Sequence, residues 1–93
     1  MTLALNQVAQ TLQLSPEKLW RESLRAYLSR QQRALQIDIA DLQDRYGVAT
    51  VNELARRIEQ GEIYSHPAWE DLIEWENLLA HLQRLDQLEA TVA

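Results

Sequence analysis

The sequence contains no cysteine and no phenylalanine, and it has only two glycines and two prolines in 93 residues. Without cysteine the chain has no disulfide, no thiolate nucleophile and no cysteine-based zinc site. Two glycines are too few for the glycine-rich loops that hold phosphates in P-loop or Rossmann proteins. The scarcity of helix-breaking residues favours long helices over a β structure with many turns.

Long apolar runs are also lacking. No stretch approaches the roughly 20 apolar residues that span a bilayer. The start, MTLALNQVAQ, does not follow the basic, apolar and small-residue order of a signal peptide. We therefore expect a cytoplasmic protein that is not exported by that route and does not contact a membrane.

The side-chain combinations that support catalysis are missing as well. No glycine-rich elbow surrounds a hydroxyl residue, His66 precedes a proline in a connection, and His81 lies near an apolar stripe. His66, Glu70 and Glu74 share a helical face by their spacing, which raises a carboxylate-rich metal site as an alternative. Helical di-iron sites need Glu-x-x-His, however, and Leu78 stands three positions before His81. We predict a binding protein with no metal, no cofactor and no enzymatic activity.

The net charge of -5 is unevenly distributed along the chain. Residues 1–57 carry eight cations and six acids, a net +2, whereas residues 58–93 carry one cation and eight acids, a net -7. A chain this short forms one domain with a thin core and gains stability by association. We expect a single helical domain and a homodimer, with residues 1–46 as a basic, dimerising part and residues 47–93 as an acidic, partner-binding part.

Start and stop signals predict an all-α fold of four helices. Apolar residues at i, i+3, i+4 and i+7 indicate a short first helix: Leu5, Val8, Ala9 and Leu12. A strand over residues 2–5 is the alternative. The tripeptide Ser15-Pro16-Glu17 supplies an N-cap, a proline at the first helical position and a first-turn acid, and Gly47 suits a left-handed cap. These signals predict a long second helix over about residues 16–45.

Two more helices are predicted after Gly47. Residues 50–53, TVNE, match a capping box, which predicts a short helix that Gly61 ends. Its inward residues are Val51, Leu54, Ala55 and Ile58. Residues 65–67, SHP, restart the chain, and acids follow in a first turn, where they favour the helix dipole. The fourth helix is predicted over residues 67–90, so two long amphipathic helices would build a dimeric bundle.

The second helix carries an apolar seam with alternating spacings of three and four residues. The predicted dimer residues are Leu24, Leu28, Leu35, Ile39 and Leu42. About 30 residues give a helix of roughly 45 Å, too long for the other helices of so small a globule to cover. The helix should therefore either bend near residues 29–32 or pair with another copy.

The fourth helix bears an apolar stripe wider than a small monomer needs, with acids around it. The predicted partner surface consists of Trp69, Glu70, Asp71, Leu72, Glu74, Trp75, Glu76 and Leu79. Aromatic anchors inside a charged rim typify strong interfaces, and the acids indicate a basic protein as partner. The alternatives are a thin core that uses the whole stripe and a solvated acidic face.

Cations on the first half of the second helix suggest nucleic-acid binding. The candidate DNA-binding residues are Lys18, Arg21 and Arg25, with Arg30 and Arg33 further along. Residues 1–36 have a net charge of +3, which can lie along phosphates. A pI near 4.9 opposes a dedicated nucleic-acid binder, and ordinary surface arginines are the alternative.

Two segments resemble known families. Residues 12–30, LQLSPEKLWRESLRAYLSR, resemble the helix-turn-helix portion of ribbon-helix-helix proteins, in which a Ser-led turn precedes a helix that packs in the dimer. The matching positions are Leu14, Ser15, Glu17, Leu19, Glu22, Ser23, Leu24, Tyr27 and Leu28. Residues 46–78 look like small antitoxin-type proteins of bacterial or archaeal toxin–antitoxin pairs. The resemblance implies an N-terminal part that dimerises and binds operator DNA, and an acidic C-terminal part that caps a basic toxin.

Three hypotheses follow for the function. The first is an antitoxin-like module that dimerises and caps a cationic protein through its acidic, Trp-containing fourth helix. The second is a DNA-binding transcriptional regulator that uses the basic second helix. The third is a structural subunit of a helical bundle.

Overall fold

The computed structural model describes the backbone of residues 2–92 and the side chains of residues 4–92. It contains four helices: α1 (Thr2–Leu12), α2 (Pro16–Tyr46), α3 (Val51–Glu59) and α4 (Ser65–Val92). No strand occurs within residues 2–92, so the all-α prediction is confirmed and the strand alternative for residues 2–5 is wrong. Within the same residues, no helix combines the length and apolarity needed to cross a membrane.

The helix ends follow the capping chemistry of the sequence. Ser15 Oγ accepts a hydrogen bond from the backbone N–H of Lys18 at 3.1 Å, which caps α2. Gly47 ends α2 in the left-handed region, with φ of 62°. Before α3, Thr50 Oγ1 accepts from the backbone N–H of Glu53 at 3.1 Å, and the Glu53 carboxylate accepts from the backbone N–H of Ala49 at 3.2 Å. The capping box therefore satisfies two free donors as predicted.

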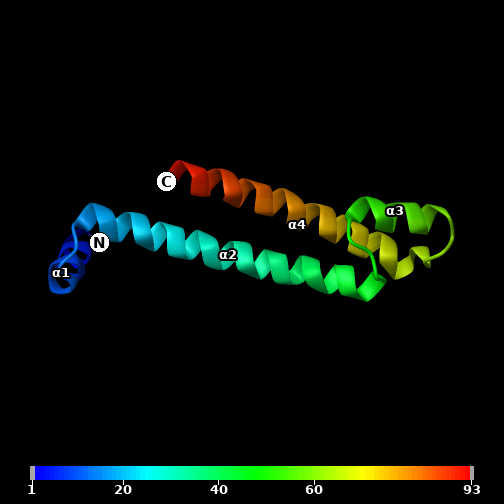
Figure 1. Cartoon of the computed structure of the whole chain (residues 1–93), viewed down its shortest axis with the longest axis horizontal. Coiled ribbons are helices and arrows are strands. Elements are labelled where there is room, and N and C mark those ends of the chain that lie inside the picture. The colour runs from blue at the N-terminus through cyan, green and yellow to red at the C-terminus, as the bar shows by residue number, and fades with distance from the viewer. Residues whose placement is uncertain (1, 93) are drawn as a thin grey trace.

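The two long helices form an antiparallel hairpin. In Figure 1, α4 lies alongside α2, α3 packs at the turn of the hairpin, and α1 crosses the start of α2. The chain is 61 Å long and about 20 Å wide. Of the two alternatives for this helix, the bend near residues 29–32 is wrong, because α2 is continuous from Pro16 to Tyr46. His66 has non-helical φ and ψ, so the regular part of α4 starts at Pro67, as predicted.

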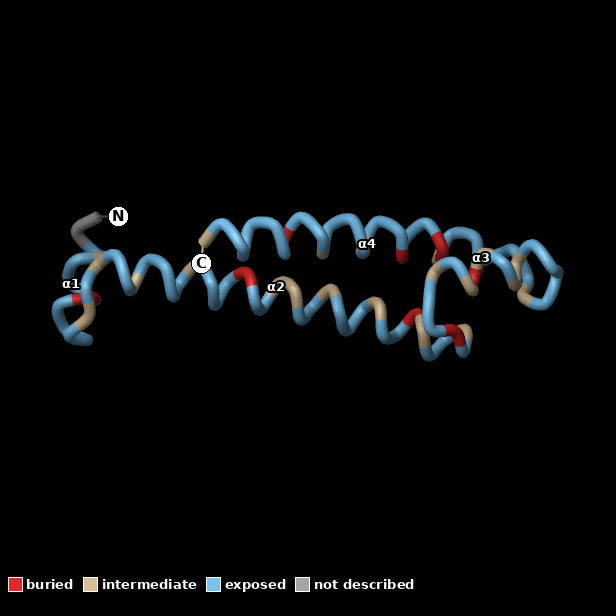
Figure 2. The backbone as a smooth tube through the Cα atoms, turned by 45° about the horizontal axis from the view of Figure 1, so that its top comes forward, coloured by how far each residue is buried: buried red, intermediate tan, exposed pale blue. Residues whose placement is uncertain are grey.

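The buried core is concentrated near α3. Its cluster consists of Leu42, Val48, Leu54, Leu72 and Trp75. Leu54 and Trp75 are only 0% and 2% exposed. Figure 2 shows most buried positions gathered where α3 meets the hairpin. We call this half, residues 33–84, the closed end.

The other half of the hairpin is thinly packed. Its buried apolar residues among the described side chains are Ala9, Leu28 and Leu85. Gln32 Nε2 donates to Asp86 Oδ1 at 2.8 Å across the hairpin, which marks the boundary between the two halves. We call residues 2–32 and 85–92 the open end. Its helices are held by far fewer buried side chains than those of the closed end.

The structure corrects the role predicted for the apolar seam of α2. Leu28 and Leu42 are buried within a single chain, and Ile39 packs against the core cluster. Leu24 and Leu35 are half-buried. The length of α2 predicts that the rest of so small a chain does not cover it, but α4, with 28 residues, lies along most of it. Leu28, Ile39 and Leu42 therefore stabilise the hairpin and are not a free dimer surface, whereas Leu24 lies near the start of α2, away from the core cluster.

Candidate functional site

The exposed side of α4 keeps part of the predicted partner surface. Trp69 is 52% exposed and Ile73 is 44% exposed. They are four residues apart and share one side of the helix. Glu70, Glu74 and Glu76 are exposed around them. We call these five residues the outer α4 face; it combines an aromatic anchor with a carboxylate rim.

Leu72 and Trp75 do not belong to that surface. They are 5% and 2% exposed and lie in the core cluster, against α2 and α3. The apolar stripe of α4 serves the chain's own core on this side, so these two side chains are not accessible to a partner. Leu79 is 39% exposed and lies at the edge of the hairpin. Of the two tryptophans on α4, only Trp69 is available for binding.

Asp71 was also predicted to bind a partner, but it is engaged within the chain. Its Oδ2 accepts a hydrogen bond from Tyr46 Oη and one from Arg45 Nη1, the latter at 3.0 Å. The pKa of Asp71 is lowered, first by the Tyr46 hydrogen bond and then by Arg45, while burial acts against them. Burial raises the pKa of the Tyr46 hydroxyl, and its bond to Asp71 raises it further. This network fastens α4 to the end of α2.

Within the described residues, the three glutamates of the outer α4 face have no partner as close as those of Asp71. Glu70 lies 3.7 Å from His66 Nδ1, and both side chains are largely exposed. Contacts between side chains as exposed as these contribute little to stability. Glu70 is therefore available to a cationic partner.

The cations proposed for DNA lie on the open end. Lys18, Arg21 and Arg25 are exposed and spaced i, i+3 and i+7, which places them along one side of α2. Arg25 shares a shallow hollow with Asp86 and Glu89 of α4. These acids offset part of the positive potential that phosphates would require.

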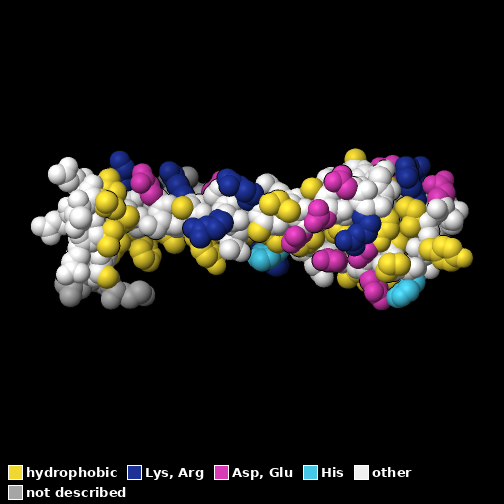
Figure 3. All heavy atoms as spheres, turned by 90° about the horizontal axis from the view of Figure 1, so that it is seen from below, with side chains coloured by type: hydrophobic (Ala, Val, Ile, Leu, Met, Phe, Trp, Pro, Cys, Tyr) yellow, Lys and Arg dark blue, Asp and Glu magenta, His cyan; other side chains and the backbone are white. Residues whose placement is uncertain are grey.

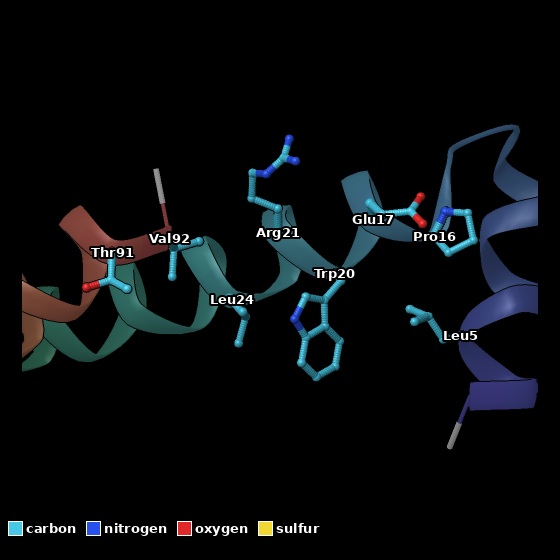
Figure 4. Close-up of a pocket in the computed structure, with 8 residues that line it drawn as sticks. All are labelled: Leu5, Pro16, Glu17, Trp20, Arg21, Leu24, Thr91 and Val92. Carbon is cyan, nitrogen blue, oxygen red and sulfur yellow. The ribbon is translucent and has the colours of Figure 1, made fainter.

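A groove at the open end was not anticipated from the sequence. It has a volume of about 540 Å³ and is lined by residues from α1, the first turns of α2 and the last turns of α4. Figure 4 shows Trp20 and Leu24 on its α2 side, Leu5 pointing from α1 toward Trp20, and Val92 beyond Leu24. The spacing of Trp20 and Leu24 was visible in the sequence, but the approach of α1 and α4 was not. We call this the open-end groove.

The described side chains form neither a cluster for a metal ion nor a buried unpaired polar group. Among the residues that the structure describes, no group of three or more His, Cys, Asp or Glu is placed to hold a metal ion. No buried polar side-chain atom in the same part of the chain lacks a hydrogen-bond partner. What the surface does offer is charge segregation and exposed aromatics. Figure 3 shows acidic side chains gathered over the closed end and Lys and Arg side chains toward α1.

Comparison with known proteins assigns the chain to a sequence family. No curated protein and no solved structure matches it significantly. A family model described as "Uncharacterized protein MJ0235 family" matches residues 1–89, which is nearly the whole chain. The four-helix hairpin with its acidic closed end therefore belongs to the MJ0235 family.

Proposed function

We propose that this chain is a protein–protein interaction module that acts as a homodimer and binds a cationic protein through the outer α4 face. The observation that carries the proposal is Trp69, half-exposed on a rigid helix and surrounded by Glu70, Glu74 and Glu76. A large exposed aromatic inside a charged rim is a common centre of binding energy in protein interfaces.

Electrostatics supports a basic partner. The closed end carries five cations, namely Arg33, Arg45, Arg56, Arg57 and Arg84, against ten acids, Asp38, Asp41, Asp44, Glu53, Glu59, Glu62, Glu70, Asp71, Glu74 and Glu76. Its net charge is therefore -5, the net charge of the whole chain. Such a field speeds the encounter with a cationic protein, and the buried aromatic contact then slows its release.

The mechanism that fits this surface is occlusion. α4 would cover a basic surface of the partner and block access to it. The resemblance of residues 46–78 to antitoxin-type proteins points to a toxin as that partner. A short basic protein, if a neighbouring reading frame encodes one, would be the first candidate to test.

Binding to that protein tests the proposal directly. Trp69→Ala combined with Ile73→Ala should weaken the affinity about 30-fold, because loss of a central anchor costs about 2 kcal/mol or more. Trp20→Ala is the matched control, since Trp20 is equally exposed but lies at the other end. Titration calorimetry measures the affinity, and co-expression measures whether growth is restored. If the double variant binds as tightly as the parent chain, the outer α4 face is not the site.

A DNA-binding function is the second candidate, and one observation favours it: Lys18, Arg21 and Arg25 form an exposed row on α2. Binding to DNA from the chain's own upstream region should fall steeply with salt and be lost in Arg21→Ala with Arg25→Ala. Absence of binding at low salt would remove this candidate. A purely structural subunit would instead form one stable oligomer and bind neither probe.

A further inference from the structure

We propose that the open-end groove is the dimer interface, and that its occupant is the same groove of a second copy of this chain. This inference rests on the homodimer of the proposed function and locates its contact surface. Of the predicted α2 seam the groove includes only Leu24, because Leu28 and Leu42 are buried within the chain. It also lies at the opposite end of the rod from the outer α4 face.

Exposed apolar side chains of α2 and α4 follow the groove residues at helical spacing. Trp20 is 56% exposed, and Leu24 and Tyr27 follow it at four and seven residues, on the same side of α2. Tyr27 is 57% exposed. On α4, Leu88 is 52% exposed and precedes the groove residue Val92 by one helical turn. Exposed aromatic and leucine side chains beside an apolar groove are typical of a surface that binds another protein.

The exposed area of the chain is large enough to supply an interface. A compact monomer of 10.8 kDa exposes about 5,500 Å², whereas this chain exposes 6909 Å². The excess is about 1,400 Å², and a stable dimer needs to bury only about 800 Å² on each partner. The radius of gyration is 19.3 Å, against about 12 Å for a compact domain of this length, because the hairpin is elongated. The hairpin presents the surface of half a bundle.

The charge of the open end favours a second copy of the chain as the occupant of the groove. The open end carries four cations, Lys18, Arg21, Arg25 and Arg30, and four acids, Glu17, Glu22, Asp86 and Glu89, so its net charge is zero. Two chains of net charge -5 repel each other when their closed ends approach. That repulsion is weakest when they meet at their open ends.

The groove itself is electrostatically self-complementary. Glu17 and Arg21 both line it. In a two-fold contact each residue of one copy meets the partner's symmetry-related surface, so one acid and one cation per copy satisfy each other. A strongly basic partner would repel Arg21, and a strongly acidic partner would repel Glu17. A small polar ligand is not favoured either, because the groove's three polar side chains, Glu17, Arg21 and Thr91, are all exposed.

The first test is the mass of the full chain in solution, measured by light scattering and sedimentation over micromolar concentrations. We expect a dimer for the parent chain and for Trp69→Glu, and a monomer for Trp20→Glu. Circular dichroism checks that each variant stays helical. A monomeric parent chain, or a dimer that survives Trp20→Glu and is lost in Trp69→Glu, would overturn the interface.

The second test does not depend on the fold of a single variant. Glu17→Arg makes both groove charges positive, and Arg21→Glu makes both negative. Each variant alone should dimerise at least tenfold more weakly than the parent chain, and an equimolar mixture should recover a heterodimer. If the mixture associates no better than the separate variants, the two grooves do not face each other.

These measurements separate the two proposals. Trp20→Glu should lose the dimer and still bind the cationic partner as a monomer, whereas Trp69→Ala should lose the partner and keep the dimer. A dimer that forms through the groove while the partner is not bound leaves this inference intact and removes the proposed function.

Discussion

The two ends of this hairpin are built from the same pair of helices, yet they differ in packing and in charge. The closed end has α3 as a third element, a buried tryptophan and a net charge of -5. The open end has only α1 laid across α2, few buried side chains and no net charge. Two helices alone cannot surround a core, so a third element decides which half is self-sufficient. The half without it is the half that gains from another chain.

The largest expected effect is at the core of the closed end. Trp75→Ala should destabilise the chain by about 3–5 kcal/mol, because it leaves a cavity among fully packed side chains. Trp20→Ala, at the open end, should change the stability of the monomer by less than about 0.5 kcal/mol, since this side chain is half-exposed. Urea denaturation at low concentration, where the monomer dominates, compares the two. Equal losses would show that the two ends are equally packed.

An intermediate effect is expected at the network that fastens α4 to α2. Tyr46→Phe removes a hydrogen bond to a charged group and should cost about 1–2 kcal/mol at neutral pH. The lowered pKa of Asp71 adds stability above its ordinary pKa of 3.8, and this is lost as pH falls through the lower pKa of the folded chain. The raised pKa of Tyr46 adds stability below its ordinary pKa of 10.0, and this is lost as pH rises through the higher folded pKa.

The free energies of unfolding of the parent chain and Tyr46→Phe should therefore differ most at pH values between the pKa of Asp71 and that of Tyr46. The two values should converge in acid and in strong alkali. Urea denaturation of both proteins across pH measures the difference. Arg45→Gln is the control; it should have a smaller effect, because Arg45 is an exposed partner in the same network. A difference that does not change with pH would show that Tyr46 contributes packing only.

The smallest expected change in stability comes from removing the equivalent helix N-caps at the two ends. Thr50→Ala should cost about 1 kcal/mol of global stability, because α3 forms part of the cooperative core. Ser15→Ala removes the same kind of bond from α2 at the open end, where local fraying absorbs the loss, and global stability should change less. Amide hydrogen exchange should show the change confined to the first turns of α2. A larger global loss for Ser15→Ala would mean that the open end folds cooperatively with the rest.

The helix boundaries could be predicted because they depend on local chemistry. Ser15 and Thr50 accept hydrogen bonds from backbone groups three residues away, and Gly47 reverses the chain in a conformation that suits glycine. None of these interactions requires knowledge of the tertiary structure. The all-α fold and its two long helices followed from them.

The assignment of apolar faces failed where it depended on tertiary packing. The stripe of α4 contains Trp69 and Trp75, and spacing alone does not tell which side α2 and α3 cover. The structure buries Trp75 and exposes Trp69. In the same way, Leu28 and Leu42 looked like a surface for another chain because the sequence did not show that α4 would lie against them. The open-end groove escaped prediction for the same reason, since three separate helices build it.

The continuous α2 helix also fixes a distance. It has no glycine or proline after Pro16, and its hydrogen bonds run from the open end to the closed end, so it has no hinge along roughly 45 Å. A chain that joins its copy at one end and binds at the other would hold two binding sites at a set spacing. This fixed spacing favours targets whose own binding sites are the same distance apart, because the second contact then forms at a high effective concentration.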